Sequence, residues 1–233
     1  MRLTPELVAR CFRPVPEPET PPEGFTRLGE EEIAAEAAAL SAAAGTGPLW
    51  LFAYGSLIWN PVFAQVEARR ALAHGWRRSF CIELTSWRGT PEAPGLMLAL
   101  EPGGACAGVA YRLDPATREA DLVELVRRET PFRELLGNAR WIGIAASGHR
   151  LRALTFYAGP TGVPVRRLPE STTALWIARA CGYAGSCAEY LYNTVAHLEA
   201  EGIRDSRLWR LQRLVAEEIA RWPAIPLAPA GPD

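Results

Sequence analysis

The chain has 233 residues, a hydrophobic content of 48% and a formal net charge of -1 at pH 7, which suits one domain with a substantial core. A near-neutral charge without basic clusters gives no broad field for nucleic acid, so nucleic-acid binding is not expected. No apolar run approaches the ~20 residues of a membrane-spanning helix, and the N-terminus lacks the apolar block of a signal peptide. No membrane association and a cytoplasmic location are therefore expected.

The cysteine and histidine patterns bear on disulfides and metals. The 5 cysteines are odd in number and form no Cys-x-x-Cys pair, which favours reduced thiols over a disulfide framework. They are Cys11, Cys81, Cys106, Cys181 and Cys187. The 3 histidines lie far apart in the chain and lack metal-ligand spacing. Neither a metal nor a cofactor is therefore expected.

The N-terminal part of the chain divides into a linker and a helix. Residues 14–24 contain too many prolines for a helix or a central strand and indicate an extended linker. Thr26 or Gly29 then begins an Ala/Glu-rich helix that runs to about Ala44 and is closed by Gly45. We expect this helix to pack on the body of the protein or to shield a sheet edge.

The central part of the chain shows strand patterns. Residues 49–54 predict a buried strand, and residues 76–84 predict a second strand-like segment. Two hairpins are predicted: 95–101 with 106–113 across Pro102-Gly103-Gly104, and 140–147 with 151–158 across Gly148-His149-Arg150. A helix that ends near Glu129 lies between them.

The C-terminal part predicts three helices and completes an α+β pattern. Ser171-Thr172-Thr173 caps a helix ending at Gly182, Ser186 and Glu189 form a capping box for the next, and Asp205 precedes a last helix ending before Pro223. Strands interrupted by one helix and followed by helices indicate one α+β domain.

The segment from Leu51 to Trp59 is the first candidate binding site. An apolar strand-like run stops abruptly at a Gly-Ser turn that leaves backbone N–H groups free, and such a turn can hold a carboxylate. Gly55 accepts backbone conformations that are closed to residues with a Cβ, so the chain can fold closely around a ligand. An ordinary structural turn after a buried strand is the alternative.

Glu129 is the candidate catalytic residue. Leu122, Leu125 and Val126 mark one helical face, and Glu129 falls on that same face, where the core should be. Pro131 disfavours continuation of the helix, so the helix should end near Glu129. Burial and the helix dipole would both raise the pKa of this carboxyl, which suits a general base and acid. The alternative is a helix-terminal carboxylate paired with a nearby arginine: Arg127, Arg128 or Arg133.

Four motifs in one order carry a resemblance to a known family. They are Tyr54-Gly55-Ser56-Leu57-Ile58-Trp59, then Arg88-Gly89-Thr90-Pro91 with Pro94-Gly95, then Gly108-Val109-Ala110-Tyr111-Arg112-Leu113, then Arg128-Glu129. In this order they resemble the ChaC family of glutathione-specific γ-glutamylcyclotransferases, over about residues 49 to 220. The first motif alone is typical of the wider cyclotransferase superfamily, and the second and third are more particular to ChaC proteins.

The resemblance implies a small mixed β-barrel with helices around it. It also implies cleavage of the γ-glutamyl bond of glutathione by internal cyclisation, which releases 5-oxoproline and cysteinylglycine. Glu129 would be the proton acceptor. The substrate's γ-glutamyl part would be held by Leu51, Phe52, Ala53, Tyr54, Gly55, Ser56 and Leu57. Residues 1–48 would then form an N-terminal extension, 49–223 the catalytic domain and 224–233 a C-terminal tail.

The chain also departs from the family pattern. Leu96 stands where many members carry Arg after the Pro-Gly pair, and no Tyr follows Glu129 within a few residues. The helix start often written Gly-x-Asn-x-x-Tyr-Leu has Cys187 in place of Asn but keeps Tyr190, a candidate substrate-binding residue. These departures leave recognition of the cysteinylglycine half open. Arg88 either contacts an anionic substrate group or braces a loop.

Two other functions stay open from the sequence. One is cyclisation of γ-glutamyl amines or amino acids other than glutathione, and the other is a non-catalytic regulatory protein that keeps the pocket. The presence of Glu129 argues against the second. A small-molecule γ-glutamyl compound is the expected partner in either case, and the sequence does not indicate the oligomeric state.

Overall fold

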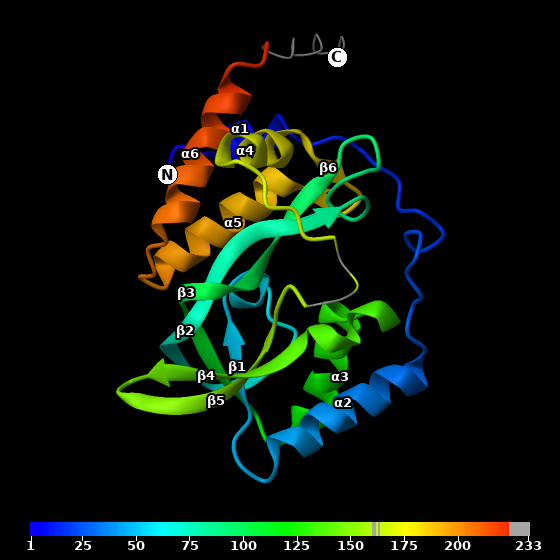
Figure 1. The fold of residues 1–233 in the computed structure, drawn as a ribbon, viewed down its shortest axis with the longest axis vertical. Helices are drawn as coiled ribbons and strands as arrows, with labels where there is room; N and C mark the ends of the chain where they lie inside the picture. Colours follow the sequence, from blue (N-terminus) through cyan, green and yellow to red (C-terminus); the bar gives the residue numbers. More distant parts are fainter. Residues whose placement is uncertain (160–161, 163, 224–233) are drawn as a thin grey trace, which may run out of the picture.

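A computed structural model describes residues 1–159, 162 and 164–223, and its centre is a closed mixed β-barrel (Figure 1). The strand order is β1-β3-β2-β4-β5. The strands are β1 Trp50–Ala53, β2 Gln65–Leu84, β3 Gly95–Leu113, β4 Ala139–Ala146 and β5 His149–Phe156. Only the closing pair, β1 with β5, is parallel. The predicted α+β class and mixed barrel are confirmed, whereas the predicted tail at 224–233 lies outside the described residues.

Strands β2 and β3 form one long antiparallel ribbon, so the predicted hairpin of 95–101 with 106–113 is wrong. β3 passes through Pro102-Gly103-Gly104 without reversing and pairs with β2 on both sides of this site. Gly103 and Gly104 have φ of 105° and 86°, and Gly75 beside them on β2 has φ of 81°. A register shift between His74 and Trp76 accompanies these glycines. They therefore bend a continuous ribbon instead of making a turn.

The second predicted hairpin, β4 with β5, is confirmed. Its turn lies at Ser147 and Gly148, about two residues earlier than predicted, with φ of 49° and 78°. Two residues of positive φ suit a tight hairpin between twisted strands. Five short elements were not predicted from the sequence: the helix α1 (Pro5–Ala9), the 3-10 helices η1 (Ser56–Ile58) and η2 (Arg133–Asn138), and the strands β6 (Cys181–Gly182) and β7 (Gly185–Ser186).

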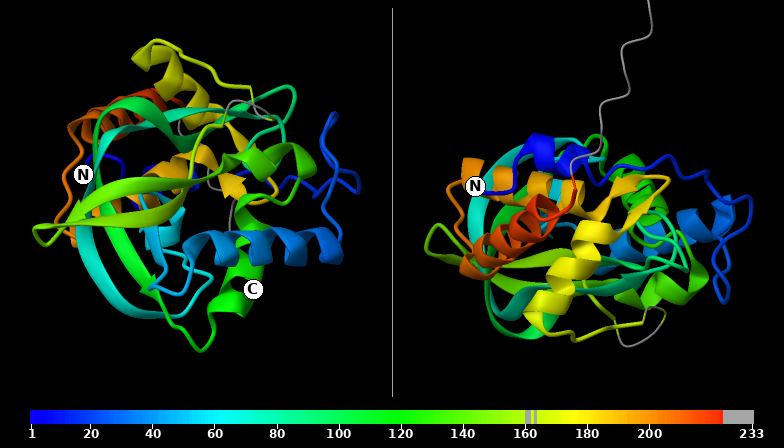
Figure 2. Two further views of the ribbon diagram at one scale, coloured as in Figure 1. Left: turned by 60° about the horizontal axis from the view of Figure 1, so that its bottom comes forward. Right: turned by 90° about the horizontal axis from the view of Figure 1, so that it is seen from above.

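The helices form two groups around the barrel (Figures 1 and 2). Helix α2 packs on α3, and α1, α4, α5 and α6 pack together along the β2–β3 ribbon. Their bounds are α1 Pro5–Ala9, α2 Glu30–Ala44, α3 Arg118–Glu129, α4 Glu170–Arg179, α5 Cys187–Ala200 and α6 Ser206–Ala220. None of the helices within the described residues is long and apolar enough to cross a membrane.

The helix ends test the predicted caps. Gly29 and Gly45 bound α2 as predicted, and the Asp205 carboxylate caps α6. The Ser186 hydroxyl accepts a hydrogen bond from the Glu189 amide at 3.1 Å and so caps α5. The predicted cap of α4 is wrong, because α4 already begins at Glu170, so Ser171-Thr172-Thr173 lies inside its first turn.

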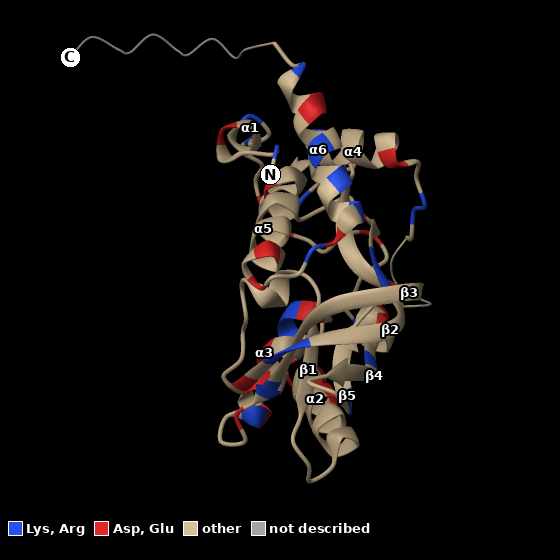
Figure 3. Cartoon of the chain, turned by 90° about the vertical axis from the view of Figure 1, so that its left-hand side faces the viewer, with Lys and Arg blue, Asp and Glu red and all other residues tan. Residues whose placement is uncertain are grey.

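The N-terminal 48 residues contribute to the same core as the barrel. Leu3 in the N-terminal segment and Ile33, Ala37 and Leu40 of α2 are buried in one cluster with the residues of β1, β3, α3 and α5. The helix at 30–44 therefore packs on the body, as expected. Both α3 and α6 carry acidic as well as basic positions (Figure 3).

Gly108 marks the close approach of β1 to β3 and gives a stability prediction. A Cβ at Gly108 would lie 2.4 Å from the Ala53 carbonyl oxygen and 2.7 Å from the Phe52 ring. We expect Gly108→Ala to lower the free energy of unfolding by about 3 kcal/mol through overpacking, measured by urea denaturation. Gly143→Ala in β4 is the control, because nothing lies within 4 Å of its Cβ position. Similar losses in both variants would contradict this account.

Candidate active site

A pocket lies where the end of β1, helix η1, the end of α3 and the start of α5 meet. It brings together Glu129, Tyr190 and the loop that follows β1. Its walls are Phe52, Tyr54, Gly55, Ser56, Leu57, Ile82, Met97, Leu98, Ala99, Glu129, Leu135, Asn138, Phe156, Tyr157 and Tyr190. Segments that are far apart in the sequence, from Phe52 to Tyr190, therefore surround the Glu129 carboxylate.

The loop after β1 has the free amides that the Gly-Ser turn predicts. All four residues of β1 are buried, and they pair with β3 and β5. The chain then leaves the sheet at Tyr54, and η1 begins at Ser56. Within the described residues, the amides of Gly55, Ser56 and Leu57 donate no hydrogen bond to the protein. First-turn amides have no partner inside their own helix, so they can bind an anionic group.

Glu129 is the last residue of α3, and it lines the pocket. Leu122, Leu125 and Val126 on the same face are fully buried, which confirms the predicted face and the end of the helix. The Glu129 side chain itself is 21% exposed, and its Oε1 lies 3.2 Å from Arg128 Nε. Arg128 also donates to the Asn60 carbonyl just beyond η1. Glu129 therefore forms the ion pair with Arg128 that the sequence offered as an alternative, and it also lines the pocket.

The ionisable groups of the pocket influence one another. Burial raises the pKa of Glu129, and the Arg128 guanidinium opposes this rise. Burial and then the Glu129 charge raise the pKa of Tyr190 to about 12. Burial, followed by Tyr190 and Glu129, raises the pKa of Tyr54 well above its ordinary value. At neutral pH both phenols therefore keep their protons and can donate hydrogen bonds.

Tyr190 is held from two sides. It lies in the first turn of α5, 3% exposed, and its ring meets those of Trp59 and Phe80 at centroid distances of 6.1 and 5.9 Å. The Arg88 guanidinium lies 5.5 Å from the Tyr190 ring centroid. Since a cation attracts an aromatic ring face, Arg88 supports the ring as well as the helix that carries it.

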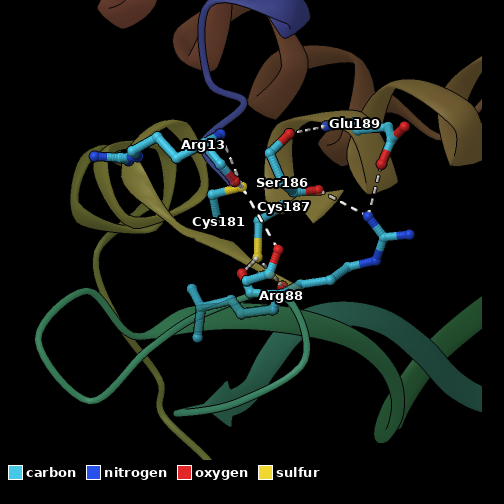
Figure 4. Close-up of polar contacts among 8 residues, drawn as sticks. Arg13, Arg88, Cys181, Ser186, Cys187 and Glu189 are labelled. Atoms are coloured by element: carbon cyan, nitrogen blue, oxygen red, sulfur yellow. Dashed lines mark hydrogen bonds and ion pairs between the residues drawn. The ribbon is translucent and has the colours of Figure 1, made fainter. Parts of the chain in front are cut away.

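Arg88 does not line the pocket. Its Nη1 donates to the Ser186 carbonyl at 3.0 Å and to Glu189 Oε2 at 2.9 Å, so it braces the N-terminus of α5 (Figure 4). This is the bracing role that the sequence left open, and a direct substrate contact stays a prediction. Leu51 and Ala53 are also absent from the walls, and both are buried in β1. Phe52 and Tyr54 to Leu57 do line the pocket.

Two of the three departures from the family pattern, Leu96 and Cys187, do not line the pocket. Leu96 is fully buried in the main core. The Cys187 thiol is also buried and donates to the carbonyls of Arg88 and Leu96 at 3.2 and 3.5 Å (Figure 4). Neither residue is a wall of the pocket. A role of Leu96 and Cys187 in recognition of the cysteinylglycine half stays a prediction.

The remaining walls of the pocket were not predicted from the sequence. They are Ile82, Met97, Leu98, Ala99, Leu135, Asn138, Phe156 and Tyr157. These residues come from β2, β3, η2 and the end of β5. No local pattern marks them, because only closure of the barrel brings them together.

The raised pKa of Glu129 predicts the pH dependence of a reaction in which it acts as base. A base must be ionised to accept a proton, so the acidic limb of kcat/KM follows the pKa of this group in the free protein. Since burial raises that pKa, we expect the limb to lie above the ordinary value of a Glu side chain, about 4.3. Initial rates across mildly acidic pH would measure it. A rate that stays flat down to the ordinary value would contradict the expectation.

Fold and site together define a γ-glutamyl cyclotransferase-like protein, and comparisons with known proteins give the family. Residues 49–218 match the family described as ChaC-like protein. The chain belongs to the ChaC family. It is 37% identical over 194 residues to the glutathione-specific gamma-glutamylcyclotransferase of Escherichia coli strain K12, a match that covers 80% of each chain.

Two further comparisons extend this result. The Homo sapiens glutathione-specific gamma-glutamylcyclotransferase 1 is 31% identical over 151 residues, which cover 61% of this chain and 66% of the human protein. A crystal structure of the γ-glutamyl cyclotransferase specific to glutathione from yeast matches with a TM-score of 0.64 and 21% identity, over 74% of this chain and 100% of that chain. The structural match shows that the barrel fold is shared.

Proposed function

We propose that this protein cleaves glutathione to 5-oxoproline and cysteinylglycine. The observation that supports the proposal is one pocket of a ChaC-family chain that is lined by Glu129 and by Gly55, Ser56 and Leu57, whose amides donate no hydrogen bond within the described residues. A carboxylate and a row of amide donors are what a γ-glutamyl group requires, since that group carries an ammonium and a carboxylate on the same carbon.

The reaction forms one C–N bond and breaks another. The α-amine nitrogen of the γ-glutamyl group attacks its own γ-carbonyl carbon, the five-membered ring closes, and the amide bond to the cysteine nitrogen breaks. Glu129 takes a proton from the ammonium, which frees the amine to attack, and gives that proton to the departing nitrogen; the second proton that the attacking nitrogen loses on ring closure matches the one with which the departing amine becomes an ammonium. No water is consumed, because the nucleophile is the substrate's own nitrogen. Because the attack is intramolecular, holding the substrate in a near-cyclic pose supplies much of the rate.

The residues around Glu129 have distinct roles in this proposal. The loop amides hold the α-carboxylate and thereby set the position of the amine. Tyr190 keeps its proton at neutral pH and faces the same pocket as Glu129, so its hydroxyl can donate to the substrate. The raised pKa of Glu129 favours return of the proton in the second half of the reaction.

We also propose that the protein acts in the cytoplasm on a small-molecule substrate without nucleic acid as partner. Its five cysteines are free and buried, which suits a reducing compartment. The formal net charge of -1, with acidic as well as basic residues on both α3 and α6, supports the absence of nucleic acid (Figure 3).

The test is to incubate the purified protein with glutathione and, separately, with γ-glutamyl dipeptides, and to measure 5-oxoproline and the released amine. Equal amounts of 5-oxoproline and cysteinylglycine from glutathione are expected. Turnover of dipeptides with none of glutathione would favour the wider substrate class. Binding of glutathione without product would favour a regulatory protein and overturn the proposal.

A further inference from the structure

Arg78 is a buried guanidinium that the proposed mechanism does not use. It lies on β2 opposite Leu100 of β3, and only 2% of its side chain is exposed. It is not a wall of the pocket. Burial of a charge is costly unless its partners satisfy it, so the partners of Arg78 indicate its role.

The donors of Arg78 join three separate segments of the chain. Its Nε donates to the Tyr54 carbonyl at 2.7 Å, and its Nη2 donates to the Ala107 carbonyl on β3. Its Nη1 donates to Asp205 Oδ2 at 3.1 Å. The other oxygen of Asp205 accepts from two amides in the first turn of α6, at 3.1 and 3.2 Å. Arg78 thus fixes the loop after β1 to the ribbon and to the start of α6.

We infer that Arg78, held by Asp205, is a positioning residue that presents the Gly55 amide to the α-carboxylate of the substrate. The Tyr54 carbonyl and the Gly55 N–H belong to one planar peptide, so fixing the carbonyl also fixes the direction of the N–H. A charged donor on the carbonyl polarises that peptide and makes its N–H a stronger donor. The inference rests on the proposed function, in which this amide binds the carboxylate.

The test measures binding without turnover, in a Glu129→Gln background. The two ligands are glutathione and 4-aminobutanoyl-cysteinylglycine, which is glutathione without its α-carboxylate. Arg78→Lys keeps the positive charge but loses the planar fork that reaches three acceptors. We expect the Kd of glutathione to rise about tenfold, the size of one hydrogen bond to a charged group, and the Kd of the analogue to change less than about twofold.

Two further variants separate positioning from folding. Asp205→Asn keeps a side-chain oxygen that can cap α6 but removes the charge that holds Arg78, so it should change the two Kd values in the same pattern as Arg78→Lys but less strongly. Arg77→Lys is the matched control, since Arg77 is next to Arg78 on β2 and pairs with Glu101 at 3.4 Å. It has no contact with the loop carbonyl and should leave both Kd values unchanged.

Equal increases in Kd for both ligands would make Arg78 a purely structural residue and overturn the inference. If thermal unfolding shows that Arg78→Lys does not fold, the Asp205→Asn comparison decides by the same criterion. If the Glu129→Gln protein binds glutathione and the analogue with the same Kd, the loop does not bind the α-carboxylate, and the inference fails. Formation of 5-oxoproline by the unaltered protein separately decides whether the proposed function holds.

Discussion

Glu129→Gln should reduce 5-oxoproline formation from glutathione by about a thousandfold, within the range for loss of a general base. Gln has nearly the same shape but cannot accept the amine proton, so glutathione should still bind. The measurement combines 5-oxoproline release under saturating glutathione with the Kd of glutathione by calorimetry. Activity near that of the unaltered protein would show that Glu129 is not the general base.

The control for this variant is Glu124→Gln. Glu124 lies on the same helix, and its side chain is 53% exposed and paired with Arg127. Its substitution should leave turnover unchanged.

Burial raises the pKa of Glu129, so the folded protein binds this proton more tightly than the unfolded chain does. Stability then falls as pH rises from the unfolded pKa to the folded pKa. Glu129→Gln should therefore melt no lower than the unaltered protein at neutral pH.

Gly55→Ala should raise the KM for glutathione about tenfold, because the loop backbone and Tyr190 approach each other closely at this residue. A Cβ at Gly55 would lie 3.3 Å from the Tyr190 hydroxyl and 3.3 Å from Leu98 Cδ2. The φ of Gly55 is -143°, which is not a left-handed conformation. We therefore expect displacement of the tyrosine and the loop amide, with little strain in the backbone.

Steady-state kinetics with glutathione, and inhibition by its analogue without the α-carboxylate, would measure this effect. Removing the carboxylate should weaken binding to the unaltered protein more than binding to Gly55→Ala, because the variant has already lost that contact. Gly47→Ala is the control, since nothing lies within 4 Å of its Cβ position. Equal losses in both proteins would leave Gly55 as an ordinary turn residue.

The parts of the site that local sequence patterns define could be predicted. Glu129 was predicted because its face is set by three buried residues within two helical turns and its helix end is set by Pro131. The bend at Gly103 and Gly104 could not be predicted correctly, because glycines of positive φ serve a turn and a bulged strand equally well. Only pairing with β2 decides between them, and that pairing involves residues far away in the sequence.

The same limit applies to the contacts around the loop. Arg78 and Asp205 are distant in the chain, and no local spacing relates them to Tyr54. Asn138 and Tyr157 reach the pocket only after β4 and β5 have closed the barrel. The sequence therefore indicates Glu129 and the loop after β1, whereas closure of the fold determines which residues pack around them.

The β2–β3 ribbon has a consequence for the order of folding. Its strands are joined only by residues 85–94, and the pair Leu84 with Gly95 lies next to that connection. Closing a short loop loses little entropy, so pairing can spread from this end along the ribbon, whereas the parallel pairing of β1 with β5 joins distant parts of the chain. We expect Leu98→Ala, near the connection, mainly to slow refolding, and Ala153→Gly, in β5, mainly to speed unfolding. The part of the pocket formed by Leu98 and Ala99 would then fold before α3 brings the Glu129 carboxylate to it.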